Sequence, residues 1–310
     1  MKPWFRTKLL PLVALALIAL GVSSAAIPKP IPIVLDTDIG TDIDDAFALA
    51  LILKSPQFDL RAVTTVTGDT RARARLAARM LWVADRRDVP VAAGIGGGVH
   101  DIAQTRWADG FTSPSLLSEP GVGLLKHEID RGRGKIVVVA IGPLTDIAAL
   151  LTRYPREKKN IRQIVLMGGS IAHGYYPGSG PAAEYNIAQD PHASQIVFSS
   201  GIPILMAPLD VTARTQMDAA HLDRLFAAGT PLTNALHALY VLWGQPVPTL
   251  HDPMAVSLLL DPGLCNIQPM HVEITDQGMT IPIAGKPNAD VAVTTDPARF
   301  IDFYLNRVAQ

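Results

Sequence analysis

The stretch that decides the fold reads IVLDTDIGTDIDDA and covers residues 33–46. Its first three residues, Ile33, Val34 and Leu35, form a short continuous apolar run that is typical of a buried strand. Residues 46–54 are again almost entirely apolar, and the length of this run favours a buried helix. A buried strand followed closely by a buried helix predicts the first unit of a parallel sheet that is covered by helices.

The same alternation of strand and helix continues to the end of the chain. Further strands are predicted where compact apolar or β-branched runs occur, at residues 60–67, near Val91, and at 135–141, 161–167, 204–206 and 291–293. Helices are predicted at 71–85, 144–152, 192–199, within 222–240, and at 297–308. We therefore predict one α/β domain over residues 27–310, with an open, mostly parallel sheet and helices on both faces. Ligands of such sheets bind beyond the carboxyl ends of the strands.

The turn between the first strand and helix carries five aspartates: Asp36, Asp38, Asp42, Asp44 and Asp45. Close carboxylates repel one another, and burying them costs free energy unless a cation or hydrogen bonds compensate. Calcium prefers several oxygen ligands, and a helix N-terminus also favours the negative charge of Asp44 and Asp45. Helix capping with solvated surface charge is the alternative, but it needs fewer acids. The turn therefore predicts a metal-binding or active site.

The composition limits the possible partners. Hydrophobic residues make up 48% of the 310 residues and charged residues 18%, which is enough apolar material for a large core. The net charge of −1 offers no basic surface for a nucleic acid. The one cysteine, Cys265, cannot form a disulfide within the chain, so packing has to supply the stability.

Residues 1–26 have the composition of a signal peptide. Basic residues at the start precede an apolar run at 9–22, and small residues follow it at 23–26. An uncleaved membrane anchor is the alternative, but the run is shorter than the roughly 20 residues that a spanning helix needs, and it contains Pro11. We expect an exported protein, periplasmic or secreted, with no membrane attachment after cleavage.

Further polar segments follow predicted strands and loops along the chain. They read TTVTGD at 64–69, GPLTD at 142–146, MGG at 167–169 with AEYN at 183–186, and HDPMA at 251–255. In this order, and together with the aspartate turn, they resemble the inosine–uridine-preferring nucleoside hydrolase family from about residue 33 to the C-terminal helix. The resemblance implies a Rossmann-like nucleoside hydrolase fold and hydrolysis of the N-glycosidic bond of ribonucleosides to ribose and free base.

The resemblance also implies roles for individual residues, by their positions in these motifs. For catalysis it implies Asp38 as the general base that activates a calcium-bound water, and His251 as the acid for the leaving group. For the calcium ion it implies the carboxylates of Asp38, Asp45 and Asp252 and the backbone carbonyl of Thr145. For the substrate it implies contacts from Asp44, Asp69, Met167, Glu184 and Asn186. It further implies a small-molecule nucleoside substrate and a homo-oligomer, either a dimer or a tetramer.

Two positions depart from the commonest family pattern. The five residues 39–43 separate Asp38 from the pair Asp44 and Asp45, where the family usually has fewer. Asp42 is then either an added residue or itself a ligand. Asp69 stands where the family often has asparagine, and an acid there removes an amide donor from the expected contact. Both departures leave room for a changed substrate.

The same residues allow two other classes of function. An exported metal-dependent phosphatase would use an aspartate nucleophile in the segment 36–38, although the chain matches further phosphate-binding motifs poorly. A non-catalytic exported protein that binds nucleosides would keep the sugar contacts without activating a water. Base release from inosine or uridine separates catalysis from binding.

Side chains outside the motifs are predicted to be structural, with one exception. Arg73 and the arginines at 71, 75 and 79 are predicted to form a solvated helix face. The exception is the loop at 175–181, whose residues Tyr175 and Tyr176 are candidates to close over the base and to assist its departure in place of His251.

Overall fold

The computed structural model describes Met1, residues 29–97 and residues 102–310. Apart from Met1, the expected signal peptide therefore lies outside the described residues. Within the described part of the chain, no helix is long and apolar enough to cross a membrane.

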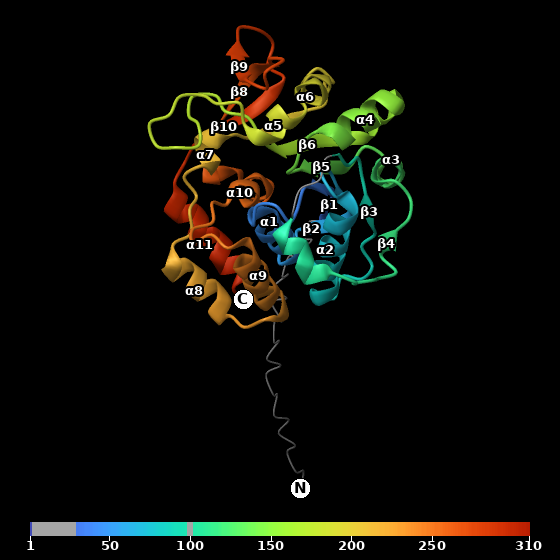
Figure 1. The fold of residues 1–310 in the computed structure, drawn as a ribbon, viewed down its shortest axis with the longest axis vertical. Helices are drawn as coiled ribbons and strands as arrows, with labels where there is room; N and C mark the ends of the chain where they lie inside the picture. Colours follow the sequence, from blue (N-terminus) through green and yellow to red (C-terminus); the bar gives the residue numbers. More distant parts are fainter. Residues whose placement is uncertain (2–28, 98–101) are drawn as a thin grey trace.

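The described residues form a ten-stranded sheet with the order β4-β3-β2-β1-β5-β6-β7-β10-β8-β9 (Figure 1). The strands are β1 (Ile31–Thr37), β2 (Phe58–Thr65), β3 (Val91–Ala93), β4 (Leu116–Leu117), β5 (Ile136–Ala140), β6 (Ile161–Met167), β7 (Ile204–Ala207), β8 (Cys265–Ile274), β9 (Thr280–Ile283) and β10 (Ala289–Thr295). Neighbouring strands from β4 to β10 pair in parallel, whereas β8 pairs antiparallel with both β10 and β9. The prediction of an α/β fold with a mostly parallel sheet is confirmed.

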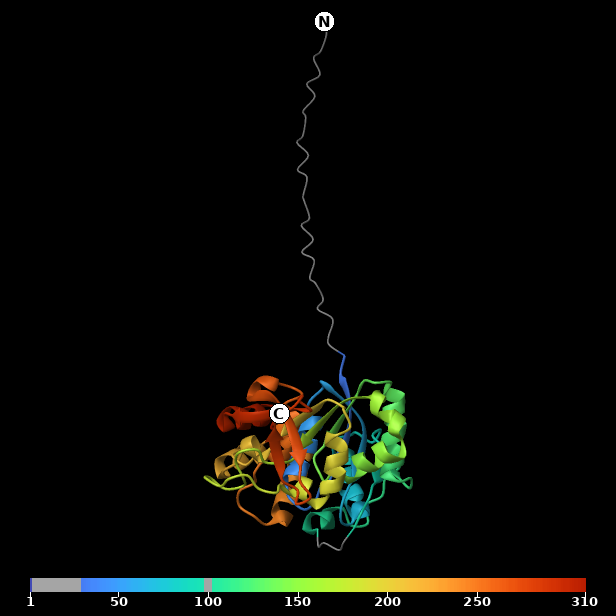
Figure 2. The same ribbon diagram turned by 90° about the horizontal axis from the view of Figure 1, so that it is seen from above.

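Helices cover both faces of this sheet, as predicted (Figures 1 and 2). They are α1 (Asp44–Leu53), α2 (Thr70–Val83), α3 (Gly121–Gly132), α4 (Thr145–Arg153), α5 (Tyr185–Gln189), α6 (Pro191–Phe198), α7 (Leu209–Thr212), α8 (Ala219–Ala227), α9 (Pro231–Trp243), α10 (His251–Ser257) and α11 (Pro297–Val308), with short 3-10 turns η1 (Ala103–Ala108), η2 (Pro155–Asn160) and η3 (Pro262–Leu264).

Strand β1 shows how the two faces of the sheet are divided. Ile33 and Leu35 pack in the core that contains α1, α2 and α11, whereas Val34 packs in the core that contains α3, α4 and α6. Figure 2 shows the C-terminal helices (orange and red) and the helices α3 and α4 (green) on opposite sides of the strands. Because both faces are covered, the central strands are apolar at successive positions rather than at alternate ones.

Helix α1 is buried on every side, and this fixes the position of its N-terminus. Its residues from Asp44 to Ile52 are all buried, because α1 packs between the sheet and the helices α9, α10 and α11. The Tyr304 hydroxyl of α11 donates to the Phe47 carbonyl at 3.1 Å, and the two rings stack with their centroids 5.9 Å apart. The two aspartates that open α1 are therefore carried into the interior by an apolar helix.

Several elements of the structure are not predicted by the sequence patterns, among them α3, the β8–β9 hairpin and α10. Helix α3 contains Gly121, Gly123 and Gly132, whose low helix propensity hides it. Strand β8 contains Pro269 and mixes buried with exposed residues, so the β8–β9 hairpin lacks a continuous apolar run. Helix α10 has Pro253 in its first turn, where the missing N–H costs no helical hydrogen bond.

Replacing Tyr304 by alanine should lower the free energy of unfolding by about 3–5 kcal/mol, since a fully buried ring would leave a cavity beside Phe47. The Tyr304→Phe variant keeps the ring and loses only the bond to the Phe47 carbonyl, so its loss should be about 1 kcal/mol. Urea unfolding followed by circular dichroism compares both variants with the wild type. Equal losses in the two variants would contradict the packing of α1 against α11.

Candidate active site

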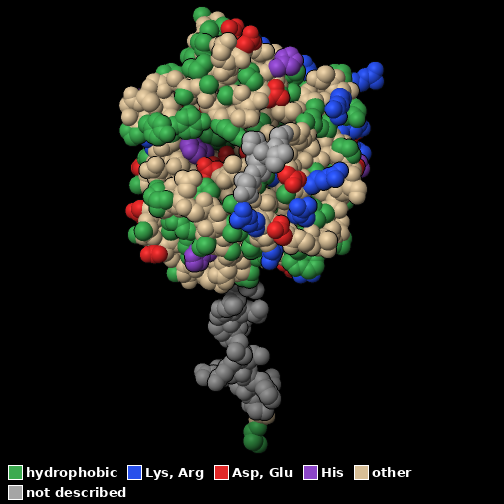
Figure 3. All heavy atoms as spheres, viewed as in Figure 1, with side chains coloured by type: hydrophobic (Ala, Val, Ile, Leu, Met, Phe, Trp, Pro, Cys, Tyr) green, Lys and Arg blue, Asp and Glu red, His purple; other side chains and the backbone are tan. Residues whose placement is uncertain are grey.

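A pocket opens beyond the carboxyl ends of the parallel strands, where the strand order reverses between β1 and β5. The cavity of about 300 Å³ is lined by residues from segments far apart in the sequence: Asp38, Thr41, Asp42, Asp44, Asp45, Ile141, Met167, Tyr175, Glu184, Tyr185, Asn186, His251 and Asp252. Figure 3 shows a hollow on this face, with acidic and histidine side chains inside it and hydrophobic side chains along its upper edge. Most of the residues predicted from the motifs therefore meet in one place.

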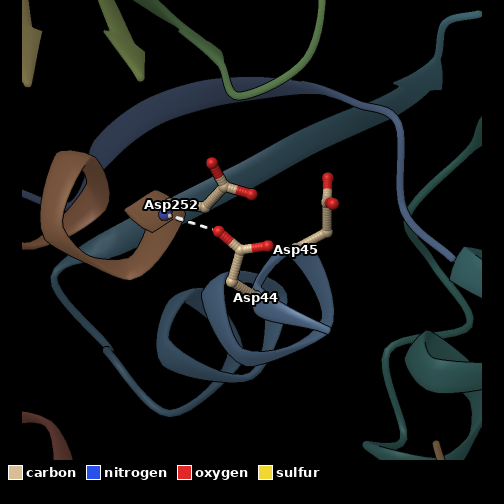
Figure 4. A group of neighbouring side chains, drawn as sticks. All are labelled: Asp44, Asp45 and Asp252. Atoms are coloured by element: carbon tan, nitrogen blue, oxygen red, sulfur yellow. Dashed lines mark hydrogen bonds between the residues drawn. The ribbon is translucent and has the colours of Figure 1, made fainter. Parts of the chain in front are cut away.

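Three buried carboxylates of the pocket lining lie close together (Figure 4). Asp44 and Asp45 open α1, Asp252 is the second residue of α10, and one oxygen from each lies within 4.8 Å of the others. The Asp252 backbone N–H donates to Asp44 Oδ2 at 3.1 Å, and the Thr37 hydroxyl donates to Asp45. We call Asp44, Asp45 and Asp252 the carboxylate cluster.

The electrostatics of the carboxylate cluster are those of a cation site. Burial raises the pKa of all three carboxyl groups, and their mutual repulsion and that of Asp38 and Asp42 raise it further. Crowded and desolvated carboxylates of this kind are stabilised by a cation, and oxygen-only ligands fit a hard divalent ion such as calcium. The donor set therefore fits the predicted metal.

Asp38 lies at the pocket immediately after β1 and is 6% exposed. Burial raises the pKa of its carboxyl to about 6, although the nearby Arg73 guanidinium lowers it. A carboxylate with a pKa in this range can accept a proton near neutral pH. Asp38 fits at this position because Gly142 has no side chain. A Cβ at residue 142 would lie 3.0 Å from Asp38 Oδ1 and 2.9 Å from the Asp38 backbone nitrogen.

The predicted sugar-binding residues come from the ends of β6 and α5. Glu184 is buried, and its carboxylate accepts hydrogen bonds from the backbone N–H groups of Gly169, Asn186 and Ile187 at 2.9, 3.0 and 3.2 Å. Burial raises the pKa of Glu184 to about 7, against the effect of these donors. The Asn186 amide nitrogen donates to the Met167 carbonyl at 3.1 Å, so the group that Asn186 can offer a ligand is its oxygen.

Part of the pocket is lined by the rings of Tyr175, Tyr185 and His251, which we call the aromatic wall. His251 begins α10, its Nδ1 lies 2.9 Å from the Thr212 hydroxyl, and its ring meets the Tyr175 ring edge to face with centroids 6.4 Å apart. The Tyr175 hydroxyl accepts a hydrogen bond from the Tyr185 backbone N–H at 2.8 Å, and Tyr185 itself also lines the pocket. Burial lowers the pKa of His251 to about 4, which favours a neutral imidazole at neutral pH.

Two of the predicted site residues are not brought into the pocket. Thr145 begins α4, and its hydroxyl donates to Asp190 at 2.8 Å. Asp69 is the N-cap of α2, accepts from the Ala72 N–H at 3.0 Å and is exposed. Neither residue lines the pocket, so the structure gives no support to a metal contact from the Thr145 backbone carbonyl or to a substrate contact from Asp69.

Ile141 lines the pocket at the place where the resemblance implied Thr145. It follows the last residue of β5, and its carbonyl lies 3.3 Å from the Asn186 amide nitrogen. The sequence does not single out Ile141, because a backbone carbonyl carries no side-chain signature. The signal that could find it is its position at a strand end, directly before Gly142 and Pro143.

Comparison with known proteins agrees with this geometry. The family model described as inosine-uridine preferring nucleoside hydrolase matches residues 33–302. The pyrimidine-specific ribonucleoside hydrolase RihA of Salmonella gallinarum is 34% identical over 311 residues, and the match covers 90% of this chain and 98% of that protein. The RihA protein of an Enterobacter species is 35% identical over 315 residues, with the same coverage.

Solved structures with the same fold carry similar descriptions. The purine-preferring ribonucleoside hydrolase from Gardnerella vaginalis superposes with a TM-score of 0.77 at 26% identity, covering 90% of this chain and 98% of that one. The plant nucleoside hydrolase PpNRh1 superposes with a TM-score of 0.75 at 28% identity, covering 91% and 99%.

Asp252→Asn should raise the thermal unfolding midpoint of the metal-free protein by roughly 2–5 °C, because it removes one of several buried like charges. The same change should reduce the stabilisation that calcium gives. Differential scanning calorimetry in chelator and in calcium measures both effects, with Asp223→Asn, an exposed acid on α8, as the control. A lower midpoint in chelator together with an unchanged response to calcium would argue against a cation site.

Proposed function

The chain belongs to the inosine-uridine preferring nucleoside hydrolase family, and from this premise we propose that its pocket hydrolyses the N-glycosidic bond of ribonucleosides with calcium and Asp38. The observation that carries the proposal is the meeting of the carboxylate cluster, Asp38 and the residues Glu184 and Asn186 in one cavity of about 300 Å³. That volume is at the lower end of the range for small-molecule sites.

The carboxylates of Asp44, Asp45 and Asp252 are the side chains that would hold the cation, with Asp38 beside them. The backbone carbonyl of Ile141 would be the metal ligand that was expected from Thr145, since Ile141 lines the pocket. A calcium ion bound there would supply positive charge that lowers the pKa of a coordinated water and fixes its position.

Asp38 accepts the proton of the attacking water in this proposal. Cleavage of an N-glycosidic bond develops positive charge on the ribose ring, so carboxylates around the sugar stabilise the transition state more than the ground state. Asp44 and Glu184, which both line the pocket, supply that negative charge. Hydrogen bonds from the sugar hydroxyls to Asp44, Glu184 and Asn186 orient the ring for attack, while Met167 packs beside it.

The departing base leaves toward the aromatic wall. Because burial lowers the pKa of His251 to about 4, a neutral imidazole is the form available at neutral pH. If the Thr212 hydroxyl donates to Nδ1, the remaining ring proton lies on Nε2 and can form a hydrogen bond to the base. We therefore propose that His251 assists the leaving group as a hydrogen-bond donor rather than as an imidazolium, with the Tyr175 ring packed edge to face against it.

The phosphatase alternative finds little support in this geometry. Of the two aspartates in the segment 36–38, Asp38 lines the pocket, whereas Asp36 is fully buried beneath it. Asp36 Oδ1 accepts a hydrogen bond from the Thr64 hydroxyl at 2.5 Å. A nucleoside-binding protein without catalysis would keep the sugar contacts but would release no base from inosine or uridine.

A panel of ribonucleosides and one nucleotide, assayed with calcium and with excess chelator, tests the proposal. We expect free base and ribose from uridine, cytidine or inosine, loss of activity in chelator, and its recovery when calcium is added back. Chromatography of the bases and a reducing-sugar assay measure the products. Phosphate release without base release would favour the phosphatase, binding without turnover would favour the binding protein, and full activity in chelator would exclude the metal.

Asp38→Asn should lower kcat by about 10²–10⁴-fold, because the amide cannot accept the proton of the water. The KM for the nucleoside should change little, since the sugar contacts come from other side chains. Steady-state kinetics at saturating calcium separate the two parameters. Equal losses in kcat and in nucleoside affinity would remove Asp38 as the base.

A further inference from the structure

One arginine of α2 is buried directly below the loop that carries Asp38. The sequence places Arg73 on a solvated helix face, and that prediction is wrong: Arg73 is 1% exposed, whereas Arg71 on the same helix is exposed. A fully buried guanidinium needs a specific set of partners, because removing its charge from water is costly.

The partners of Arg73 are neutral oxygen atoms of two turns. Its Nε donates to the Thr67 carbonyl at 2.9 Å, Nη1 donates to the carbonyls of Asp38 and Ile39, the latter at 3.0 Å, and Nη2 donates to the Thr41 hydroxyl at 2.8 Å. The planar guanidinium thus joins the turn after β1 to the turn after β2. Thr67 has a φ of 60°, an uncommon conformation for a β-branched residue.

A second buried side chain ties down the same loop. Gln104 of η1 is fully buried, and its amide nitrogen donates to the Asp42 carbonyl at 2.7 Å and to the Thr41 carbonyl at 3.4 Å. Thr41 and Asp42 of the loop at 39–43 both line the pocket. Arg73 and Gln104 therefore hold this loop against α2 and η1.

Arg73 also contributes a charge to this loop. Its guanidinium contacts the backbone of Asp38 and Ile39 and so places a positive charge beside the turn that carries Asp38. The permanent positive charge of Arg73 therefore lies against the backbone of Asp38, whereas the Asp38 side chain lines the pocket.

We propose that Arg73 is a positioning residue, which holds the loop after β1 in its working shape before a metal ion binds and so places Asp38 for proton transfer. The proposal rests on the role proposed above for Asp38. The requirement is for the guanidinium and not only for a cation, because four acceptors in two turns need its fixed fork of donors. Lysine at this position would keep the charge but could not reach the same set of acceptors.

Three variants test the proposal: Arg73→Met removes charge and donors, Arg73→Lys keeps the charge, and Arg71→Met is the matched control on an exposed face of the same helix. At saturating calcium, Arg73→Met should lower kcat about 100-fold with KM within about threefold, since a small misplacement of a reacting group has that effect. Arg73→Lys should recover only part of the loss. Arg71→Met should match the wild type.

Two measurements without nucleoside make the result independent of turnover. Calcium titration by calorimetry should show about tenfold weaker binding in Arg73→Met, because Asp38 and its neighbours are no longer held in place. Hydrogen exchange of the metal-free proteins should show faster exchange at residues 38–42 in both Arg73 variants than in Arg71→Met.

The outcomes separate this proposal from the proposed function. Unchanged exchange at 38–42, or a kcat in Arg73→Lys equal to that of the wild type, would overturn the positioning role even if nucleosides are hydrolysed. If the wild type neither binds calcium nor releases base, the proposed function fails, and faster exchange at 38–42 still supports the loop contact. Should Arg73→Met not fold, Arg73→Lys carries the kinetic and exchange comparisons.

Discussion

The structure depends on one electrostatic constraint: several carboxylates are forced together where water is scarce. Helix α1 is apolar on every side, so it is enclosed between the sheet and the helices of the C-terminal part of the chain. Its first turn carries Asp44 and Asp45 into the interior, and α10 brings Asp252 within 4.8 Å of them. Hydrophobic packing therefore sets the distance between like charges, and the site is stabilised when a cation offsets them.

The topology explains why residues so distant in sequence share this site. In a parallel sheet all strands deliver their carboxyl ends to the same edge, and the strand order reverses between β1 and β5, so the connections diverge there and leave a crevice. Asp38 follows β1, Ile141 follows β5, and Met167 ends β6. Each of the three reaches the pocket because of its place at a strand end, whatever its side chain contributes.

The sequence predicts the parts of this arrangement that follow from local patterns. Continuous apolar runs locate the central strands, and the density of aspartates locates the site. Tertiary contacts explain the rest: Thr145 and Asp69 are polar motif residues that the fold uses at helix N-termini, while Ile141 serves through its backbone. Arg73 did carry a readable signal, because it shares the buried face of α2 with Leu76, Ala77 and Met80 at helical spacing.

The pocket divides into two parts that have different physical demands. The carboxylate side is fixed by α1, α10 and the buried contacts of Arg73 and Gln104, which leaves little freedom for change without loss of the cation site. The aromatic side is built from the loop that carries Tyr175 and from Tyr185, both of which are substantially exposed. Similar proteins are described as pyrimidine-specific and as purine-preferring. In the binding mode proposed above, the ribose lies against the carboxylates and the base lies against the aromatic side, so we expect differences in base preference to arise from the aromatic side.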